Sequence, residues 1–407
     1  MTLPDYFLAD LPPEATLNGQ MLWEACQTLK RNREHYLAQR STRNIIKVLH
    51  DVGENWLDAA YPIRRLALEQ GPRATGFSLP TLTRGLETFF QRLTGDNLEA
   101  LVLHDLGHAH RMDSLVATAA EQKNSNAAMT TGPELILHFA AGNVPNPAFM
   151  SIVLGLLARS AQFMKCATGG SFLPRMFAHS IYDADSKLGA CIEIAEWPGG
   201  RTDLEDALFA EADCVTVTGS DDTIAALRTR VPVRARLLTY GDRLSFGYVA
   251  AEALAGFNAK KIIEHAATDV IAWDQLGCLS PHLIYVEHGG AVSAEQFAHK
   301  LAEELGARET TEPRRKLSVD EAAVIASKRG FYKIRGANSE DTRLWCSEDS
   351  TAWTVVYEAD PRFQVSCLNR FVYVKAVTDI TEALQAAESL RGKVSSVGLA
   401  APEHQAQ

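Results

Sequence analysis

The sequence predicts an α/β protein with a doubly wound parallel sheet, followed by a second α/β domain. Between residues 134 and 241, short apolar runs alternate with segments that place apolar residues at helical spacing. Strands that alternate with helices indicate a parallel sheet, whose ligands bind beyond the carboxyl ends of its strands. The pattern changes after about residue 240, and 407 residues suit two domains of about 100–200 residues each.

The first domain is expected to begin with helices, because residues 18–39 and 41–57 place apolar side chains at three- and four-residue intervals. The alternating elements that follow are a strand over 134–142, a helix over 147–161, a strand over 161–167, a helix over 184–197, a strand over 214–219, a helix over 221–230 and a strand over 234–241. We therefore expect a mostly helical part over 1–130 and the sheet core over 131–240.

The second domain, residues 241–407, mixes helices and strands. Ser318 and Glu321 have the spacing of a capping box, and we expect their helix to stop at Gly330. Residues 342–361 are typical of two strands joined by a polar turn; a strand over 370–377 and a helix over 380–392 follow. The charged segment 307–317 contains a proline and predicts an exposed loop in which Arg314–Lys316 are solvated.

Composition excludes several classes of partner. The formal net charge of -10 and the pI near 5.7 argue against binding to nucleic acid or to an anionic membrane. No apolar run reaches the ~18–20 residues of a membrane span, and the acidic N-terminus is unlike a secretory signal, so we expect a cytoplasmic protein. The seven cysteines form no CxxC pair and are expected to be free thiols.

One histidine group raises the question of a metal. His104 and His108 have an H-x3-H spacing, with His110 close behind, but Gly107 interrupts a helix there and no matching ligand set follows. We therefore expect a solvated loop or helix end at these residues, and no metal.

A single cysteine stands at a change of pattern. Cys278 lies between Gly277 and Leu279, where a polar run gives way to a strand over 282–287. Free cysteines are most often small, inert core residues, and spacing alone favours that role. A turn that presents the thiol to substrate is the alternative.

The order of several motifs resembles the aldehyde dehydrogenase superfamily, and within it the fatty acyl-CoA reductase branch typified by the acyl reductase of bacterial bioluminescence. These motifs are GNVP at 142–145, a strand ending in Lys165, VTVTGS at 215–220, DQ followed by Cys278 and SP, AWTVVYE at 352–358 and LNR at 368–370. The resemblance covers roughly residues 130–400. It implies an NAD(P)-binding core over 131–240 and a catalytic thiol domain over 241–407.

The resemblance implies roles for two catalytic residues. Cys278 would take the acyl group from a thioester as the nucleophile. Asn143 would aim its side-chain amide, with the backbone N–H of Cys278, at the oxygen of the tetrahedral intermediate. Without the resemblance, Asn143 is only a turn residue.

The cofactor residues are also implied by the resemblance. Gly142, at the end of an expected strand, is counted among them, and Lys165 would reach the adenosine ribose. Gly219 and Ser220 stand at a strand end before a helix, where backbone amides suit a pyrophosphate. The alternatives are a lysine that extends into solvent from a strand end and an ordinary turn at 218–220. Thr168 stands where the superfamily often has a glutamate that holds the ribose hydroxyls. With no carboxylate there to repel a 2′-phosphate, NADPH is favoured and NADH remains open.

The sequence departs from the hydrolytic members of the superfamily at one position. They carry a glutamate that activates water, whereas Thr239 or Tyr240 stands in that region here. A site that cannot activate water protects its acyl-enzyme for hydride transfer, so we expect reduction of a long-chain acyl-CoA or acyl-protein thioester to the aldehyde. A cysteine acyltransferase without hydride transfer and a catalytically silent partner subunit remain alternatives.

The resemblance also implies partners. An acyl-CoA or acyl-carrier substrate, an acyl-donor protein and a homo-oligomer are expected. Similar proteins usually run on past the segment 395–401, so the chain is either a short member of its branch or truncated.

Overall fold

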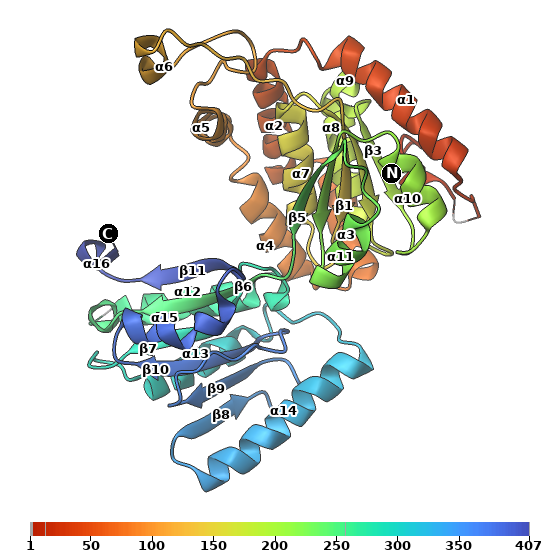
Figure 1. Cartoon of the computed structure of the whole chain (residues 1–407). Helices are drawn as coiled ribbons and strands as arrows, with labels where there is room; N and C mark the ends of the chain where they lie inside the picture. The colour runs from red at the N-terminus through yellow and green to blue at the C-terminus, as the bar shows by residue number, and fades with distance from the viewer. Residues whose placement is uncertain (1–2, 13, 257, 407) are drawn as a thin grey trace. The chain divides into compact units, whose positions relative to one another are not determined.

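The computed structural model describes residues 3–12, 14–256 and 258–406, and it divides into two compact units (Figure 1). The first unit comprises the chain up to Thr75 and Leu86–Gly241. The second comprises Gly76–Gly85 and the chain from Asp242 onward. The short segment 76–85 therefore belongs with the later half of the chain, which no local sequence pattern suggested.

The first unit contains the expected parallel sheet, with strand order β3-β2-β1-β4-β5. The strands are β1 (Leu135–Ala140), β2 (Ala161–Cys166), β3 (Ile192–Glu196), β4 (Cys214–Thr218) and β5 (Arg236–Tyr240). All neighbouring pairs are parallel. The chain builds outward from β1 to β3 and then returns to the other side of β1 at β4. This reversal is the topological switch point at which doubly wound sheets bind ligands.

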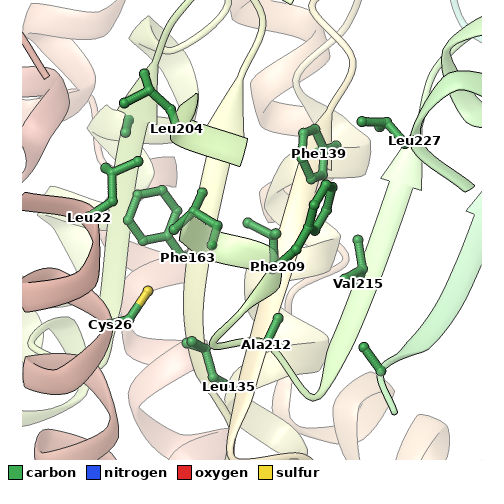
Figure 2. Packing of buried hydrophobic residues seen from close by; sticks show 14 of the residues in the cluster. Leu22, Cys26, Leu135, Phe139, Phe163, Leu204, Phe209, Ala212, Val215 and Leu227 are labelled. Atoms are coloured by element: carbon green, nitrogen blue, oxygen red, sulfur yellow. The ribbon is translucent and has the colours of Figure 1, made fainter. Parts of the chain in front are cut away.

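Helices lie on both faces of this sheet (Figure 1). The helices of the first unit are α1 (Gly19–Tyr36), α2 (Thr42–Leu57), α3 (Pro62–Thr75), α5 (Gly95–Leu106), α6 (Ala119–Lys123), α7 (Asn146–Leu157), α8 (Phe172–Ala184), α9 (Ser186–Gly189), α10 (Thr202–Phe209) and α11 (Asp221–Arg228), and α4 (Leu79–Phe90) has residues in both units. Figure 2 shows one core cluster, in which Leu22 and Cys26 of α1 and Phe209 of α10 pack with Phe163 of β2 and Phe139 of β1. Pro147 lies at the start of α7, as expected.

The helix expected over residues 184–197 is wrong. Helix α8 ends at Ala184, and Asp185 caps the short helix α9 by accepting the backbone N–H groups of Lys187 and Leu188. Strand β3 then begins at Ile192 and pairs with β2 along its length. Helix α9 and strand β3 are each too short to show a period of their own, and Glu193 interrupts the apolar run of β3.

The second unit is built on a six-stranded mixed sheet, in the order β11-β6-β7-β10-β9-β8. Its strands are β6 (Leu244–Val249), β7 (Pro281–Glu287), β8 (Thr342–Cys346), β9 (Thr354–Glu358), β10 (Phe371–Val377) and β11 (Val394–Ala400). Only the β8–β9 pair is antiparallel among these strands, which confirms the expected two strands across a polar turn.

Two layers of helices pack on this sheet. Helices α12 (Asn258–Ile271) and α13 (Ala294–Arg308) contribute to one core cluster, and α14 (Val319–Asn338) and α15 (Ile380–Ala386) to another. A short helix, α16 (Glu403–Ala406), follows β11. Among the described residues, no helix combines the length and apolarity that a bilayer span requires.

Helix α14 corrects a second expectation. The capping box of Ser318 and Glu321 is present, but the helix passes Gly330 and ends at Asn338. A Cβ at Gly330 would meet nothing within 4 Å, so this glycine lies on an open face of the helix. Burial of Arg329 and Tyr332 on either side of it stabilises the helix enough to continue.

Candidate functional site

The carboxyl edge of the first sheet gathers the residues expected to hold a cofactor. Gly142 and Asn143 follow β1, Thr168 follows β2, and Gly219 follows β4. Because these three parallel strands are neighbours, their carboxyl ends lie at one edge of the sheet.

Two of these turns lie directly against each other. A Cβ built on Gly142 would stand 3.2 Å from the Cβ of Ala167, and one on Gly170 would stand 3.2 Å from the Cα of Gly142. A side chain at either glycine would force the two turns apart. The arrangement suits a backbone cradle that a dinucleotide phosphate approaches closely.

Lys165 lies in β2 with its side chain mostly buried. Its ammonium nitrogen stands 5.8 Å from the centroid of the Trp197 ring, within cation–π range. Burial lowers the pKa of Lys165, while the nearby acidic groups of Glu205, Cys166 and Glu196 oppose that shift. The lysine is therefore held in place on the strand and does not extend freely into water.

Glu196 is a site residue that sequence reasoning missed. This last residue of β3 accepts the backbone N–H of Gly169 at 2.7 Å and that of Ser171 at 3.1 Å. It holds the loop after Lys165, and it places a carboxylate near the lysine even though Thr168 is not one. Glu196 was missed because β3 was predicted as part of a helix. Had the strand been recognised, a carboxylate at its carboxyl end would have been a candidate site residue.

Ser220 caps helix α11. Its hydroxyl accepts the backbone N–H of Thr223 at 3.3 Å, and the Gly219 N–H donates to the carbonyl of Tyr240 at 3.2 Å. The turn between β4 and α11 is thus fixed by its own hydrogen bonds. A helix N-terminus so oriented at the sheet edge favours an anion, although Asp221 and Asp222 add negative charge to its first turn.

Cys278 belongs to the second unit, and its thiol is presented rather than packed. All seven cysteines lie within the described residues, and Cys278 is the one that is exposed. Burial raises the pKa of the Cys26, Cys166 and Cys191 thiols to about 12. Those three are inert at neutral pH, since the thiolate is the reactive form. The exposure of Cys278 contradicts the expectation of a buried core cysteine, and presentation of the thiol to substrate stays a prediction.

The loop that carries Cys278 has an unusual backbone. Trp273, Asp274 and Gln275 all have positive φ values, of 48°, 51° and 67°. Non-glycine residues in this region cost about 1–3 kcal/mol each, and they persist only where the surroundings enforce them. The hydroxyl of Ser245 donates a 2.7 Å hydrogen bond to the carbonyl of Cys278, which anchors the far end of the loop to β6.

The side chain of Gln275 ties the same loop to two strands. Its amide Nε2 donates to the carbonyl of Pro281 at 2.7 Å and to that of Phe371 at 3.0 Å, and its Oε1 accepts the N–H of Phe371 at 3.0 Å. Pro281 opens β7 and Phe371 opens β10. The DQ motif therefore fixes the start of both strands beside the thiol loop.

The basic segment 314–316 is less solvated than expected. Arg314 and Arg315 are half-buried; the Arg314 guanidinium donates to the Thr351 hydroxyl at 3.0 Å, and Arg315 pairs with Glu321. The expectation of a solvated loop is wrong for these two arginines, because Arg314 bonds a residue 37 positions away and Arg315 pairs with the first turn of α14.

The histidines at 104–110 form no metal site in the described part of the chain. His104 and His110 are exposed, and no group of three or more His, Cys, Asp or Glu residues suited to a metal occurs within residues 3–12, 14–256 and 258–406.

Solved structures that match this fold include aldehyde dehydrogenases. An NADP-dependent glyceraldehyde-3-phosphate dehydrogenase from Bacillus halodurans matches with a TM-score of 0.67 and 13% identity, over 95% of this chain and 84% of that one. An NAD-dependent benzaldehyde dehydrogenase from Corynebacterium glutamicum matches with a TM-score of 0.68 and 13% identity, over 96% of this chain and 83% of that one. The fold is therefore that of the aldehyde dehydrogenases, with one parallel and one mixed sheet.

Sequence relatives define the class more narrowly. A long-chain acyl-protein thioester reductase from Vibrio harveyi is 24% identical over 356 residues, which are 86% of this chain and 70% of the relative. One from Aliivibrio fischeri is 23% identical over 367 residues, 87% of this chain and 71% of the relative. The family model described as acyl-CoA reductase (LuxC) matches residues 37–407. The chain belongs to this LuxC family of acyl-CoA reductases, oxidoreductases that form aldehydes.

Proposed function

We propose that this chain reduces a long-chain acyl thioester, carried by CoA or by a protein, to the aldehyde through a Cys278 acyl-enzyme with NADPH as the reductant. The observation that carries the proposal is the exposed Cys278 on a loop anchored at both ends, in a chain of the acyl-CoA reductase family. The similarity to long-chain acyl-protein thioester reductases supports a long-chain acyl group on a protein.

Acyl transfer is the first step. The Cys278 thiolate attacks the carbonyl carbon and forms a C–S bond, while the carbonyl π pair moves to oxygen. Asn143 is assigned as the side-chain donor to that oxygen, together with the backbone N–H of Cys278. The oxyanion then reforms the carbonyl, and the bond to the carrier sulfur breaks with its electron pair on the departing thiolate.

Reduction completes the reaction. NADPH, when bound, would supply a hydride to the acyl carbon. The acyl group on Cys278 would then be a thiohemiacetal oxyanion. As the oxygen electron pair re-forms the carbonyl, the C–S bond would break with its electrons returning to the Cys278 sulfur, and the aldehyde would leave. Strand β5 (Arg236–Tyr240) carries no carboxylate to activate water, which favours reduction over hydrolysis of the acyl-enzyme.

The residues of the first unit fit a dinucleotide. Gly142 and Gly170 carry no side chain that would keep a phosphate away from the backbone of these turns, and Lys165 lies near the end of β2, where an adenosine ribose would lie. Lys165 favours NADPH because its ammonium can pair with a 2′-phosphate. Glu196 works in the other direction, although its carboxylate is already held by two backbone N–H groups.

The test has two readouts. The protein is incubated with myristoyl-CoA, and a mass increase of one acyl group is sought that is absent from Cys278→Ala. NADPH or NADH is then added, and loss of the adduct is followed together with release of the aldehyde. Adduct discharge by NADPH supports the proposal. An adduct that persists after either nucleotide is added indicates an acyltransferase. Failure of the wild-type protein to form an adduct contradicts the proposal.

A further inference from the structure

We propose that Asp274 and Arg370 form a buried clasp that positions the Cys278 loop for acyl transfer. The proposal rests on the proposed function. Oδ1 of Asp274 accepts a hydrogen bond from Nε of Arg370 at 2.8 Å and lies 2.6 Å from its Nη2. The two side chains are 0% and 2% exposed, and 96 positions separate them in the sequence. The clasp joins the DQ motif before β7 to the LNR motif before β10.

Both partners lie in strained backbone. Asp274 is the centre of the left-handed run 273–275, and Arg370 ends a second left-handed run, 368–370, with φ values of 63°, 57° and 65°. The run 368–370 immediately precedes β10, and the run 273–275 precedes the short turn that leads into β7. Strands β7 and β10 are parallel neighbours. Such conformations persist only where contacts enforce them. Each run is held by the other, through the clasp and through the Gln275–Phe371 bonds.

The clasp also holds the basic segment beside the loop. Oδ2 of Asp274 accepts the backbone N–H of Arg315 at 3.0 Å, and Nη1 of Arg370 donates to the carbonyl of Glu312 at 2.6 Å. The two oxygens of the Asp274 carboxylate thus bond two different segments of the chain. The thiol loop, the start of β10 and residues 312–315 are thereby fixed as one body.

Asp274 lies among several arginines. The pKa of Arg314 is lowered first by burial and also by the positive charges of Arg370, Arg315 and Arg329, whereas Asp274 opposes the shift. Removing the carboxylate alone would leave the buried Arg370 without its ion-pair partner. The double replacement removes both members of that pair, so neither is left buried and unpaired.

The same sheet offers a matched control. Lys375 of β10 pairs with Glu358 of β9 at 3.4 Å, and these side chains are 0% and 1% exposed. Lys375 also donates to the carbonyl of Asp360 at 2.7 Å. This pair is similarly buried. Glu358 also contacts Arg335 and Tyr332 of α14, and none of these bonds leads to the thiol loop.

The experiment compares two reagents on Cys278. Iodoacetamide reports whether the thiol is reachable and ionised, and myristoyl-CoA acylation also requires the correct orientation. The variants are Asp274→Asn, the double variant Asp274→Leu/Arg370→Met, and the control double variant Glu358→Leu/Lys375→Met. Apolar replacement of both members of a buried pair often preserves folding, which keeps the test open if Asp274→Asn does not fold.

The clasp predicts a split between the reagents. In Asp274→Leu/Arg370→Met, acylation should slow by about 10²-fold, the usual effect of a misplacement near 1 Å, while alkylation stays within about threefold. The control variant should keep wild-type rates with both reagents. Wild-type acylation in the clasp variant would overturn the proposal, and so would equal slowing of both reagents. If the wild-type protein takes no acyl group, the proposed function fails first, and the role of the clasp in acyl transfer fails with it.

Discussion

The carboxylate of Glu196 accepts the backbone N–H of Gly169 at 2.7 Å, so the end of β3 holds the loop that follows Lys165. A second bond from the N–H of Ser171, at 3.1 Å, fixes the same loop two residues further on. The cofactor edge of the first sheet is thus set by a carboxylate as well as by glycine turns, and this has a measurable consequence.

Glu196→Gln should weaken binding of both nucleotides. The variant keeps an oxygen acceptor but loses the charge, and a hydrogen bond to a charged group is worth about 1.5–3 kcal/mol against about 1 kcal/mol for a neutral one. We expect the Kd for NADPH and for NADH to rise roughly three- to tenfold, by calorimetric titration. Glu211→Gln, which removes a carboxylate that bonds Lys30 and Gln27, is the control and should leave both constants unchanged.

Lys165→Met should change the choice between nucleotides. Methionine preserves the packing against Trp197 and removes the positive charge. If the ammonium pairs with a 2′-phosphate, the Kd for NADPH should rise by about tenfold more than the Kd for NADH. Titration of both nucleotides against the same variant measures the ratio. An equal loss for the two would mean that Lys165 contacts a part of the cofactor that they share.

Local pattern predicted the central strands well, for a physical reason. Strands β1 and β2 are buried on both faces, so they are continuous apolar runs that a sequence displays openly. Strand β3 was missed because Glu193 lies inside it. That carboxyl is buried, which raises its pKa to about 8, and it accepts the N–H of Leu8 at 2.7 Å from 185 residues away. No residue near Glu193 in the sequence indicates that it has this partner.

At the thiol site too, the local features could be predicted from the sequence and the long-range contacts could not. The glycine before Cys278 and the strand after it were enough to suggest a turn, and the motif order suggested its chemistry. The bonds that hold the turn come from Ser245, Phe371 and Arg370, which are 33 to 96 positions away from their partners in the loop. Contacts at that separation follow from the sheet order β6-β7-β10, which sequence periodicity does not determine.

Asn143→Ala should slow acylation of Cys278 by about 10²–10³-fold, the usual effect of losing one oxyanion donor. Asn143 is exposed in the turn between β1 and α7, so the melting temperature should change little. Single-turnover acylation with myristoyl-CoA measures the rate. Asn143→Asp is nearly isosteric, lacks the N–H donor and adds negative charge, so it should be at least as slow. A normal rate in either variant would remove Asn143 from the catalytic residues.

Stability should fall in mild acid because of two buried histidines. Burial lowers the pKa of His138 and of His282 to about 4. The Gln162 amide donates to the Ile152 carbonyl, so its oxygen faces Nε2 of His138, which must carry the proton of the neutral ring. Nδ1 of His282 accepts the N–H of Ser366. Both rings are therefore neutral in the folded protein.

The sign follows from linkage. The unfolded chain takes up these protons near pH 6.5 and the folded protein only near pH 4, so stability present above pH 6.5 is lost as the pH falls to 4. Each histidine can contribute up to about 3 kcal/mol. Urea unfolding of the wild type and of His138→Gln at several pH values measures the effect. The variant should lose less free energy between pH 7 and 4, and parallel pH curves would contradict the assignment.

Gly85 packs directly against the indole of Trp273, at the start of the thiol loop. A Cβ at this position would lie 2.2 Å from Cζ2 of Trp273, the first residue of the left-handed run, and Phe77 meets the same indole edge-on at 5.1 Å between ring centroids. All three residues belong to the second unit. Because the indole is held on both sides, a methyl group at residue 85 must displace it and the backbone that it anchors.

Gly85→Ala should therefore affect both stability and chemistry. Overpacking of a filled core typically costs about 1–3 kcal/mol, and displacement of Trp273 should slow acylation of Cys278 by roughly tenfold or more. Gly330→Ala is the matched control, since its Cβ would meet nothing within 4 Å on an exposed helix face. In the double variant Gly85→Ala/Trp273→Leu the smaller side chain removes the clash, and part of the stability should return. If Gly85→Ala is destabilised but acylated at the wild-type rate, the indole supports the fold without setting the position of the thiol.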